Sequence, residues 1–300
     1  MDNIPVGETI RRGYGFAVGN FAMLLGIVWL PLVLVVATGA IFGLLSPAFA
    51  PALIGNNGAA LKHAWPLMVV FYLFAFLFFS VAIVGLTECA LAEVPVRRFF
   101  YFSLDGRVWR LFKAYLLSIL IVLAVVVVVL VGLVLFGVIL AKVSGVSPDQ
   151  MKNSPMVGLM AGLVPLLLTL WLFYFIVRQM TLLAPVVVAE ETGGMRKAWT
   201  LSRGQFWRLL AIMLATGLPA VLVWLLVQYR FIFDGLPPSA ANGATPQELV
   251  QWGANGLARM KQYAFVLAPG FLLLTTFSYG AIYGALAYAY RATIEKSPAA

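Results

Sequence analysis

Six long apolar runs, separated by short polar segments, divide this sequence of 300 residues. About 20 consecutive apolar residues cross a bilayer as a helix, whereas the strands of a membrane barrel alternate in polarity over about 10. The runs are continuous, so they predict an all-α membrane protein with six transmembrane helices in a single integral membrane domain over residues 1–300. The expected spans are about Phe21–Leu45, Trp65–Thr87, Tyr115–Ala141, Met156–Val177, Leu209–Tyr229 and Tyr263–Tyr290.

Three of the polar segments carry the same pattern of an arginine, an aromatic residue and a glycine. The copies lie 87 and 98 residues apart, and each precedes two apolar runs. This pattern predicts three parallel repeats, at about 6–92, 93–190 and 191–296, related by a pseudo-threefold axis along the membrane normal. Aromatic and basic residues flank most membrane helices, so the three segments could also be similar only because each lies beside a membrane helix. The matching positions are Arg11, Tyr14 and Gly19; Arg98, Tyr101 and Gly106; Arg196, Trp199 and Gly204; and Trp109-Arg110 with Trp207-Arg208.

The third copy predicts an amphipathic helix in the membrane interface. On a helical wheel, one side of Met195–Arg208 is apolar and aromatic and includes Trp199, while the other is basic and includes Arg196 and Arg203. Aromatic side chains of such a helix enter the headgroup region, and basic side chains meet lipid phosphates. In the other two copies, the apolar and the basic residues fall on the same two sides of the helical wheel. The shared glycine, Gly204 in this copy, is expected to permit the bend from the interface into the membrane.

The distribution of basic residues predicts the orientation. If the N-terminus, the second and fourth connections and the C-terminus share one side, that side holds 14 of the 20 Lys and Arg residues. Because Lys and Arg are enriched in cytoplasmic loops, both termini are expected in the cytoplasm. The net charge of +9 then suits anionic lipid headgroups. No nucleic-acid binding is expected, because the basic residues are divided among short segments beside the membrane and no binding motif accompanies them.

Residues that commonly carry chemistry are sparse. None of the six runs contains Asp, Glu, Lys or Arg, which argues against proton- or ion-coupled transport. The single cysteine, Cys89, excludes an intrachain disulfide, and the single histidine, His63, cannot form a histidine metal site. The sequence has no HExxH, GxSxG or P-loop motif. We therefore expect no enzyme activity, no cofactor and no metal ion.

Small residues and a helix-start signal add detail to the expected architecture. Glycine pairs four residues apart let helices approach closely, which favours a compact bundle or a homo-oligomer. Before the last run, Thr245-Pro246-Gln247-Glu248 has the pattern of a helix start and predicts a short outer helix that covers the bundle or docks a partner. The glycine pairs are Gly39 and Gly43, Gly158 and Gly162, and Gly280 and Gly284.

The segment Arg178–Leu210 carries a longer pattern, in which an arginine, a proline and an acidic residue precede A-x-x-L-S-x-G and an aromatic-basic pair. It resembles the membrane domain that precedes the catalytic domain in some bacterial glycerophosphoryl diester phosphodiesterases, and related six-helix bacterial membrane proteins. No phosphodiesterase domain follows in this sequence, so the resemblance implies a membrane module without that activity. The matching positions are Arg178, Pro185, Glu190, Ala198, Leu201, Ser202, Gly204, Trp207 and Arg208.

Two hypotheses on function follow. The first, in keeping with the resemblance, is a non-enzymatic module of a bacterial inner membrane that contacts lipids or binds a partner. In it, Arg178 and Glu190 form a structural ion pair beside the third repeat. The second is a transporter or flippase of an amphipathic small molecule or lipid, with a cavity on the pseudo-threefold axis. Membrane lipids are the expected partners, with a protein partner or a homo-oligomer as alternatives. The expected structural or headgroup contacts are Arg11, Arg98, Arg110, Arg178, Glu190, Arg196, Trp199, Arg203, Gly204, Trp207 and Arg208.

Overall fold

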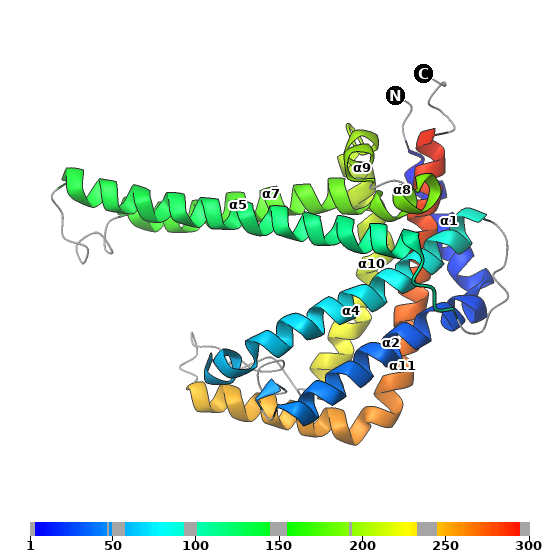
Figure 1. Ribbon diagram of the computed structural model, residues 1–300, viewed down its shortest axis with the longest axis horizontal. Helices are drawn as coiled ribbons and strands as arrows, with labels where there is room; N and C mark the ends of the chain where they lie inside the picture. Colours follow the sequence, from blue (N-terminus) through cyan, green and yellow to red (C-terminus); the bar gives the residue numbers. More distant parts are fainter. Residues whose placement is uncertain are drawn as a thin grey trace.

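The computed structural model describes residues 4–46, 48–49, 58–92, 101–144, 155–191, 194–232 and 245–294. These residues are mostly helical, and no strand occurs among them (Figure 1). The elements are α1 (Val6–Gly19), α2 (Phe21–Leu45), α4 (Gly58–Ala92), α5 (Gly106–Ser144), α7 (Pro155–Met180), α8 (Leu183–Glu190), α9 (Met195–Leu201), α10 (Phe206–Val227), the π-helical turn η1 (Gln228–Ile232) and α11 (Pro246–Ile294).

Six segments of the described chain are long and apolar enough to cross a membrane. Each overlaps one of the six predicted spans, so the prediction of an all-α chain with six membrane-spanning helices is confirmed. The architecture is that of a multi-pass membrane protein. The segments are Phe21–Leu45, Lys62–Leu91, Gly106–Phe136, Gly162–Glu190, Phe206–Ile232 and Gln251–Ile294.

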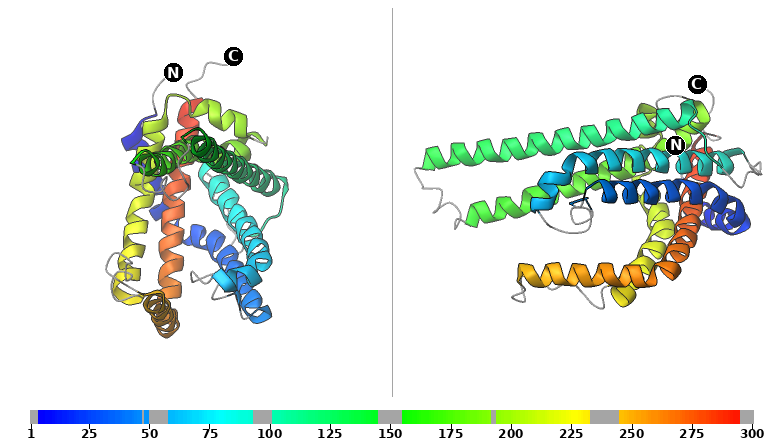
Figure 2. Two further views of the ribbon diagram at one scale, coloured as in Figure 1. Left: turned by 90° about the vertical axis from the view of Figure 1, so that its left-hand side faces the viewer. Right: turned by 60° about the horizontal axis from the view of Figure 1, so that its bottom comes forward.

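The six helices form three hairpins, α2–α4, α5–α7 and α10–α11, which diverge from one common end (Figures 1 and 2). We call this end the hub: it comprises α1, α8 and α9 with the adjoining ends of α4, α5, α7, α10 and α11. The most apolar stretch of α5 has no buried residue, so little protein covers it. The expected compact bundle is therefore not formed, because the hairpins separate as they leave the hub.

Closely packed small residues hold α1 against α11. A Cβ atom added at Gly13 would lie 2.6 Å from the Ala281 carbonyl oxygen, and one at Gly284 would lie 2.7 Å from the Phe16 ring. At Gly280 an added Cβ would lie 2.5 Å from the Leu24 side chain. The pair Gly280 and Gly284 thus permits close approach as predicted, but the helices that approach belong to the same chain.

The glycine shared by the three predicted repeats lies at a helix boundary each time. Gly204 lies between α9 and α10 with a φ of +75°, a conformation that residues with a Cβ adopt at a cost. Gly19 ends α1, and Gly106 begins α5. The chain thus leaves one helix and enters the next at Gly204, and the predicted passage from the membrane interface into the bilayer at this residue stays a prediction.

The predicted amphipathic helices differ from expectation in extent and in environment. The third is only α9, Met195–Leu201, and ends before Gly204. In the second copy, residues 101–105 are not helical, and residues 93–100 lie outside the described residues. The apolar side of α1 packs on α10 and α11, where the Tyr14 hydroxyl donates to the Ala215 carbonyl at 2.7 Å. The protein interior, rather than the bilayer, covers this side of α1.

The predicted helix start before the last span is confirmed. The Thr245 N–H donates to Glu248 Oε2 at 2.8 Å, and the Glu248 N–H donates to Thr245 Oγ1 at 3.3 Å, which is a reciprocal capping box. The helix is not a separate short element, however. It continues as α11 to Ile294 and bends on the way (Figure 1), and Pro269 inside it breaks the backbone hydrogen-bond ladder.

Candidate functional site

An ion network at the hub joins the second hairpin to the first and to α8. The Arg107 guanidinium lies 2.8 Å from Glu88 at the end of α4 and 2.8 Å from Glu191 just after α8. The hydroxyl of buried Tyr101 donates to the second Glu88 oxygen at 2.9 Å. Burial and the Glu88 carboxylate raise the pKa of Tyr101, so the phenol remains a donor. One arginine thus connects three segments that are distant in sequence.

Local sequence explains why Arg107 is available for this role. Asp105 precedes α5, and its carboxylate accepts hydrogen bonds from the N–H groups of Arg107 and Val108, both at 3.1 Å. This cap fixes the first turn of α5 beside the end of α4. Arg110, one turn later, lies 3.7 Å from Glu191. The two arginines hold the pKa of Glu191 below its ordinary value, with Arg107 the larger influence.

Glu190 and Arg178 have separate partners, which corrects the expected ion pair between them. Glu190 lies 2.5 Å from Lys197 on α9 and accepts a hydrogen bond of 2.8 Å from Tyr290 on α11. Arg178 donates to the Tyr174 hydroxyl at 2.8 Å. The two side chains leave α7 and α8 towards different neighbours, so each fastens a different pair of helices.

Arg178 is bound mainly by aromatic groups. Its guanidinium carbon lies 4.0 Å from the centre of the Trp199 ring, and a guanidinium nitrogen donates to the Trp199 carbonyl at 2.9 Å. The residue is only 8% exposed. Ring contact and hydrogen bonds together compensate for the desolvation of this charge. Trp199, itself 36% exposed, therefore attaches α9 to α7 through Arg178.

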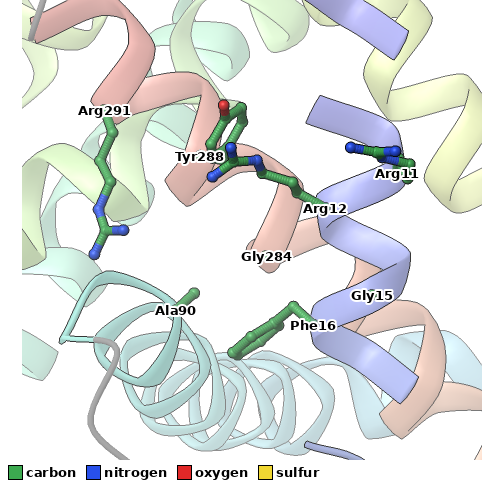
Figure 3. A pocket seen from close by; sticks show the side chains of 8 residues that line it. All are labelled: Arg11, Arg12, Gly15, Phe16, Ala90, Gly284, Tyr288 and Arg291. Carbon is green, nitrogen blue, oxygen red and sulfur yellow. The ribbon is translucent and has the colours of Figure 1, made fainter. Parts of the chain in front are cut away.

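A pocket of about 470 Å³ opens at the hub between α1, the end of α4 and the end of α11 (Figure 3). Arg11, Arg12 and Arg291 line it, with the ring of Phe16 and the methyl of Ala90 on its other side. Three guanidinium groups and an apolar floor form a site suited to an amphipathic anion.

Neighbouring residues fix two of these arginines. Arg12 lies 2.8 Å from Glu8, and its guanidinium carbon is 4.2 Å from the centre of the Tyr288 ring. Tyr288 donates to Glu8 at 3.0 Å, and Tyr288 and then Arg12 lower the pKa of Glu8. Arg291 donates to the Leu91 carbonyl at the end of α4. These contacts orient the arginines at the pocket before any ligand binds.

The other predicted contacts lie apart from this pocket. Arg196 and Arg203 are exposed at the hub, and Trp207, at the start of α10, is 77% exposed. One buried nitrogen in each of Arg110 and Arg208 has no hydrogen-bond partner among the described residues. Arg98 lies outside the described residues. Of the predicted set, only Arg11 lines the pocket.

Several residues that line the pocket were not predicted, because nothing in the sequence around them distinguishes them. Phe16 is one aromatic residue among many, and Tyr288 and Arg291 resemble ordinary residues at the end of a membrane helix. The polar side of α1, which holds Arg11, Arg12 and Gly15, was the available signal. Within the described residues, no group of three or more His, Cys, Asp or Glu could hold a metal ion.

No protein-family model, curated protein or solved structure matches this chain. The resemblance of Arg178–Leu210 to the phosphodiesterase membrane domains therefore stays a prediction. The hypothesis of a transporter with an axial cavity also stays a prediction, since the pocket described above lies at the hub and not along the spans.

Proposed function

We propose that this protein is a non-enzymatic, multi-pass module of a bacterial inner membrane whose hub faces the cytoplasm and binds anionic lipid headgroups. The observation that carries the proposal is the gathering of exposed arginines at the one end from which all three apolar hairpins depart. A hairpin immersed in lipid places its hub end at headgroup depth. Each Lys or Arg near an anionic surface contributes about 1 kcal/mol of attraction.

The hub is built to remain a rigid platform at that depth. Three of its glutamates form internal ion pairs, Glu88 and Glu191 with Arg107 and Glu190 with Lys197. Arg11, Arg196 and Arg203, in contrast, are exposed, and their side chains make no ion pair with a described residue. The carboxylates thus stabilise the hub, while free cations meet the headgroups. This division supports contact with phosphate more than docking of a basic partner.

Native mass spectrometry of the protein extracted with its lipids tests the proposal. We expect anionic phospholipids to be enriched among the bound lipids relative to the bulk membrane, and a triple variant, Arg11→Gln with Arg196→Gln and Arg203→Gln, to lose that enrichment. The matched control replaces Arg230, Arg259 and Lys261 at the opposite ends of the helices with Gln. Bound lipids of bulk composition would refute lipid recognition, and a stoichiometric co-purifying protein would favour partner binding instead.

A further inference from the structure

We propose that the pocket between α1, α4 and α11 is a specific site for one anionic glycerophospholipid, whose phosphodiester group lies among Arg11, Arg12 and Arg291. This inference rests on the proposed function and names the place where one lipid is recognised rather than loosely attracted.

The charge of the pocket suits a phosphodiester. Three arginines line it, and no acidic residue is among the lining residues. Glu8, beside the pocket, already accepts hydrogen bonds from Arg12 and Tyr288. Arg12 uses Nε and Nη2 for Glu8, and its Nη1 makes no hydrogen bond to a described residue. Arginine presents planar, paired donors that match phosphate oxygens, so Nη1 of Arg12 is available for a phosphodiester.

The lining has a polar side and an apolar side. In Figure 3 the guanidinium groups of Arg12 and Arg291 lie across the open space from Phe16 and Ala90. A free phosphate ion would use only the arginines, whereas a phospholipid also carries a glycerol backbone and acyl chains that would cover the apolar side. The lining therefore favours a lipid over a soluble anion.

The position of the pocket along the helices agrees with a lipid. Ala90 lies at the last turn of the span Lys62–Leu91, and Phe16 lies one turn before α2 begins. Gly284 belongs to the span that ends at Ile294. The pocket thus lies where apolar spans pass into the basic hub, which is the depth of the phosphate groups when the hairpins cross a bilayer.

Gly15 provides a variant that fills the pocket without removing charge. It lines the pocket, and a Cβ atom at this position would meet no atom within 4 Å. Gly15→Leu therefore places a side chain in the lipid's space without strain on α1. Gly7→Leu is the matched control, because Gly7 is on the same helix, is exposed and has equally open surroundings, but does not line the pocket.

The experiment titrates the delipidated, full-length protein in neutral detergent with dioleoyl phosphatidylglycerol or dioleoyl phosphatidylcholine and counts adducts by native mass spectrometry. We expect one phosphatidylglycerol to bind at least about tenfold more tightly than phosphatidylcholine, the size expected for a charge-assisted hydrogen-bond site. Gly15→Leu and Arg11→Gln should each lose this preference. Gly7→Leu, which adds its side chain outside the pocket, should keep it.

The outcomes separate this inference from the proposed function. Tight phosphatidylglycerol binding that survives Gly15→Leu and Arg11→Gln alike would overturn the pocket assignment and leave headgroup binding by the hub in place. No preference for phosphatidylglycerol in the unaltered protein would overturn both. Inorganic phosphate bound without phosphatidylglycerol would identify a soluble-anion site and would also overturn the lipid assignment. Equal thermal unfolding midpoints for Gly15→Leu and Gly7→Leu show that both variants are folded.

Discussion

The guanidinium of Arg178 lies over the Trp199 ring and donates hydrogen bonds to Tyr174 and to the Trp199 carbonyl. A charge this deeply buried is costly unless every polar hydrogen finds a partner. The partners of Arg178 belong to α7 and α9. The hydrogen bonds that offset the cost of burying this charge therefore also hold α7 against α9. Glu190 does the equivalent for α8, α9 and α11 through Lys197 and Tyr290.

Charge reversal distinguishes these two attachments. Arg178→Glu should destabilise the protein by about 1.5–3 kcal/mol or more, because it loses charged hydrogen bonds and leaves a buried carboxylate. Adding Glu190→Arg should not rescue it, since the two side chains are not partners. The reversal of a true pair, Glu190→Lys with Lys197→Glu, should recover most of the stability lost in either single variant. Thermal unfolding midpoints in detergent measure all five variants, and rescue of the first pair would contradict the contacts described here.

The turn between α9 and α10 depends on the backbone conformation of one residue, Gly204. Gly204→Ala should cost about 1–2 kcal/mol, because the left-handed backbone is unfavourable for a residue with a Cβ. No atom lies within 4 Å of the added methyl group, so the cost is one of backbone conformation alone. Gly19→Ala, at the end of α1, is the control and should leave the unfolding midpoint unchanged or slightly higher, as no neighbour or positive φ opposes it.

At the scale of elements, α1 is a structural member of the hub more than a helix floating in the interface. Its buried residues Thr9, Gly13 and Ala17 recur at every fourth position and face α11. The opposite side retains Arg11, Arg12 and Gly15, which line the pocket. Protein therefore covers the apolar side of the amphipathic helix α1, and its basic side, with Arg11 and Arg12, is exposed.

The contact between α1 and α11 predicts a sharp difference between two glycines of one helix. Gly13→Ala would place its methyl 2.6 Å from the Ala281 carbonyl oxygen and force the helices apart, at about 1–3 kcal/mol. Gly7→Ala meets no neighbour and should stabilise α1 by up to about 1 kcal/mol. Unfolding midpoints check both. Equal effects of the two substitutions would show that α1 does not pack tightly on α11.

The link between α5 and α8 predicts a pH dependence of stability. The pKa of Glu191 in the folded protein is below its ordinary value because of Arg107, so its stabilising effect is complete above the ordinary value of about 4.3 and is lost as the pH falls below it. The unfolding midpoint should therefore fall between pH 6 and pH 3.5, and Glu191→Gln should reduce that fall. In an Arg107→Gln background, Glu191→Gln should have little further effect, which controls for other carboxylates.

At the scale of the molecule, much of the apolar surface of the described helices is not covered by protein. The divergent hairpins leave long apolar faces uncovered, and the hub alone joins them through ion pairs and packed small residues. In a bilayer there is no hydrophobic drive to press such helices together, so close contact is limited to places with small or polar residues. The hub concentrates both kinds of residue.

Single cysteines test the proposed orientation of the whole molecule. In a Cys89→Ala background, Arg203→Cys places an exposed thiol at the hub, and Gln247→Cys places one at the opposite end. A membrane-impermeant maleimide added to intact spheroplasts should label Gln247→Cys and leave Arg203→Cys unlabelled until the cells are lysed. Labelling of Arg203→Cys in intact spheroplasts would place the hub on the outside and contradict the proposal.

The sequence by itself determined the helices and several of their ends. Charge-free runs as long as a bilayer is thick leave no other regular structure that satisfies the backbone in lipid, and these runs correspond to the six spans. The capping box at Thr245 and the helix boundary at Gly204 are equally local, because each depends on the conformation of a few adjacent residues. Such features can be inferred without knowing what lies beside them.

Only the tertiary structure decided which side chains meet. Tyr288 and Glu8 are 280 residues apart and form a hydrogen bond beside the pocket, and Arg107 joins Glu88 to Glu191 across two hairpins. An exposed arginine, a paired arginine and a ring-stacked arginine look alike in a hydrophobicity pattern. The predicted ion pair of Arg178 with Glu190 was therefore wrong: Arg178 contacts Tyr174 and Trp199 instead. The divergence of the hairpins depends likewise on packing at the hub, which no single run of residues encodes.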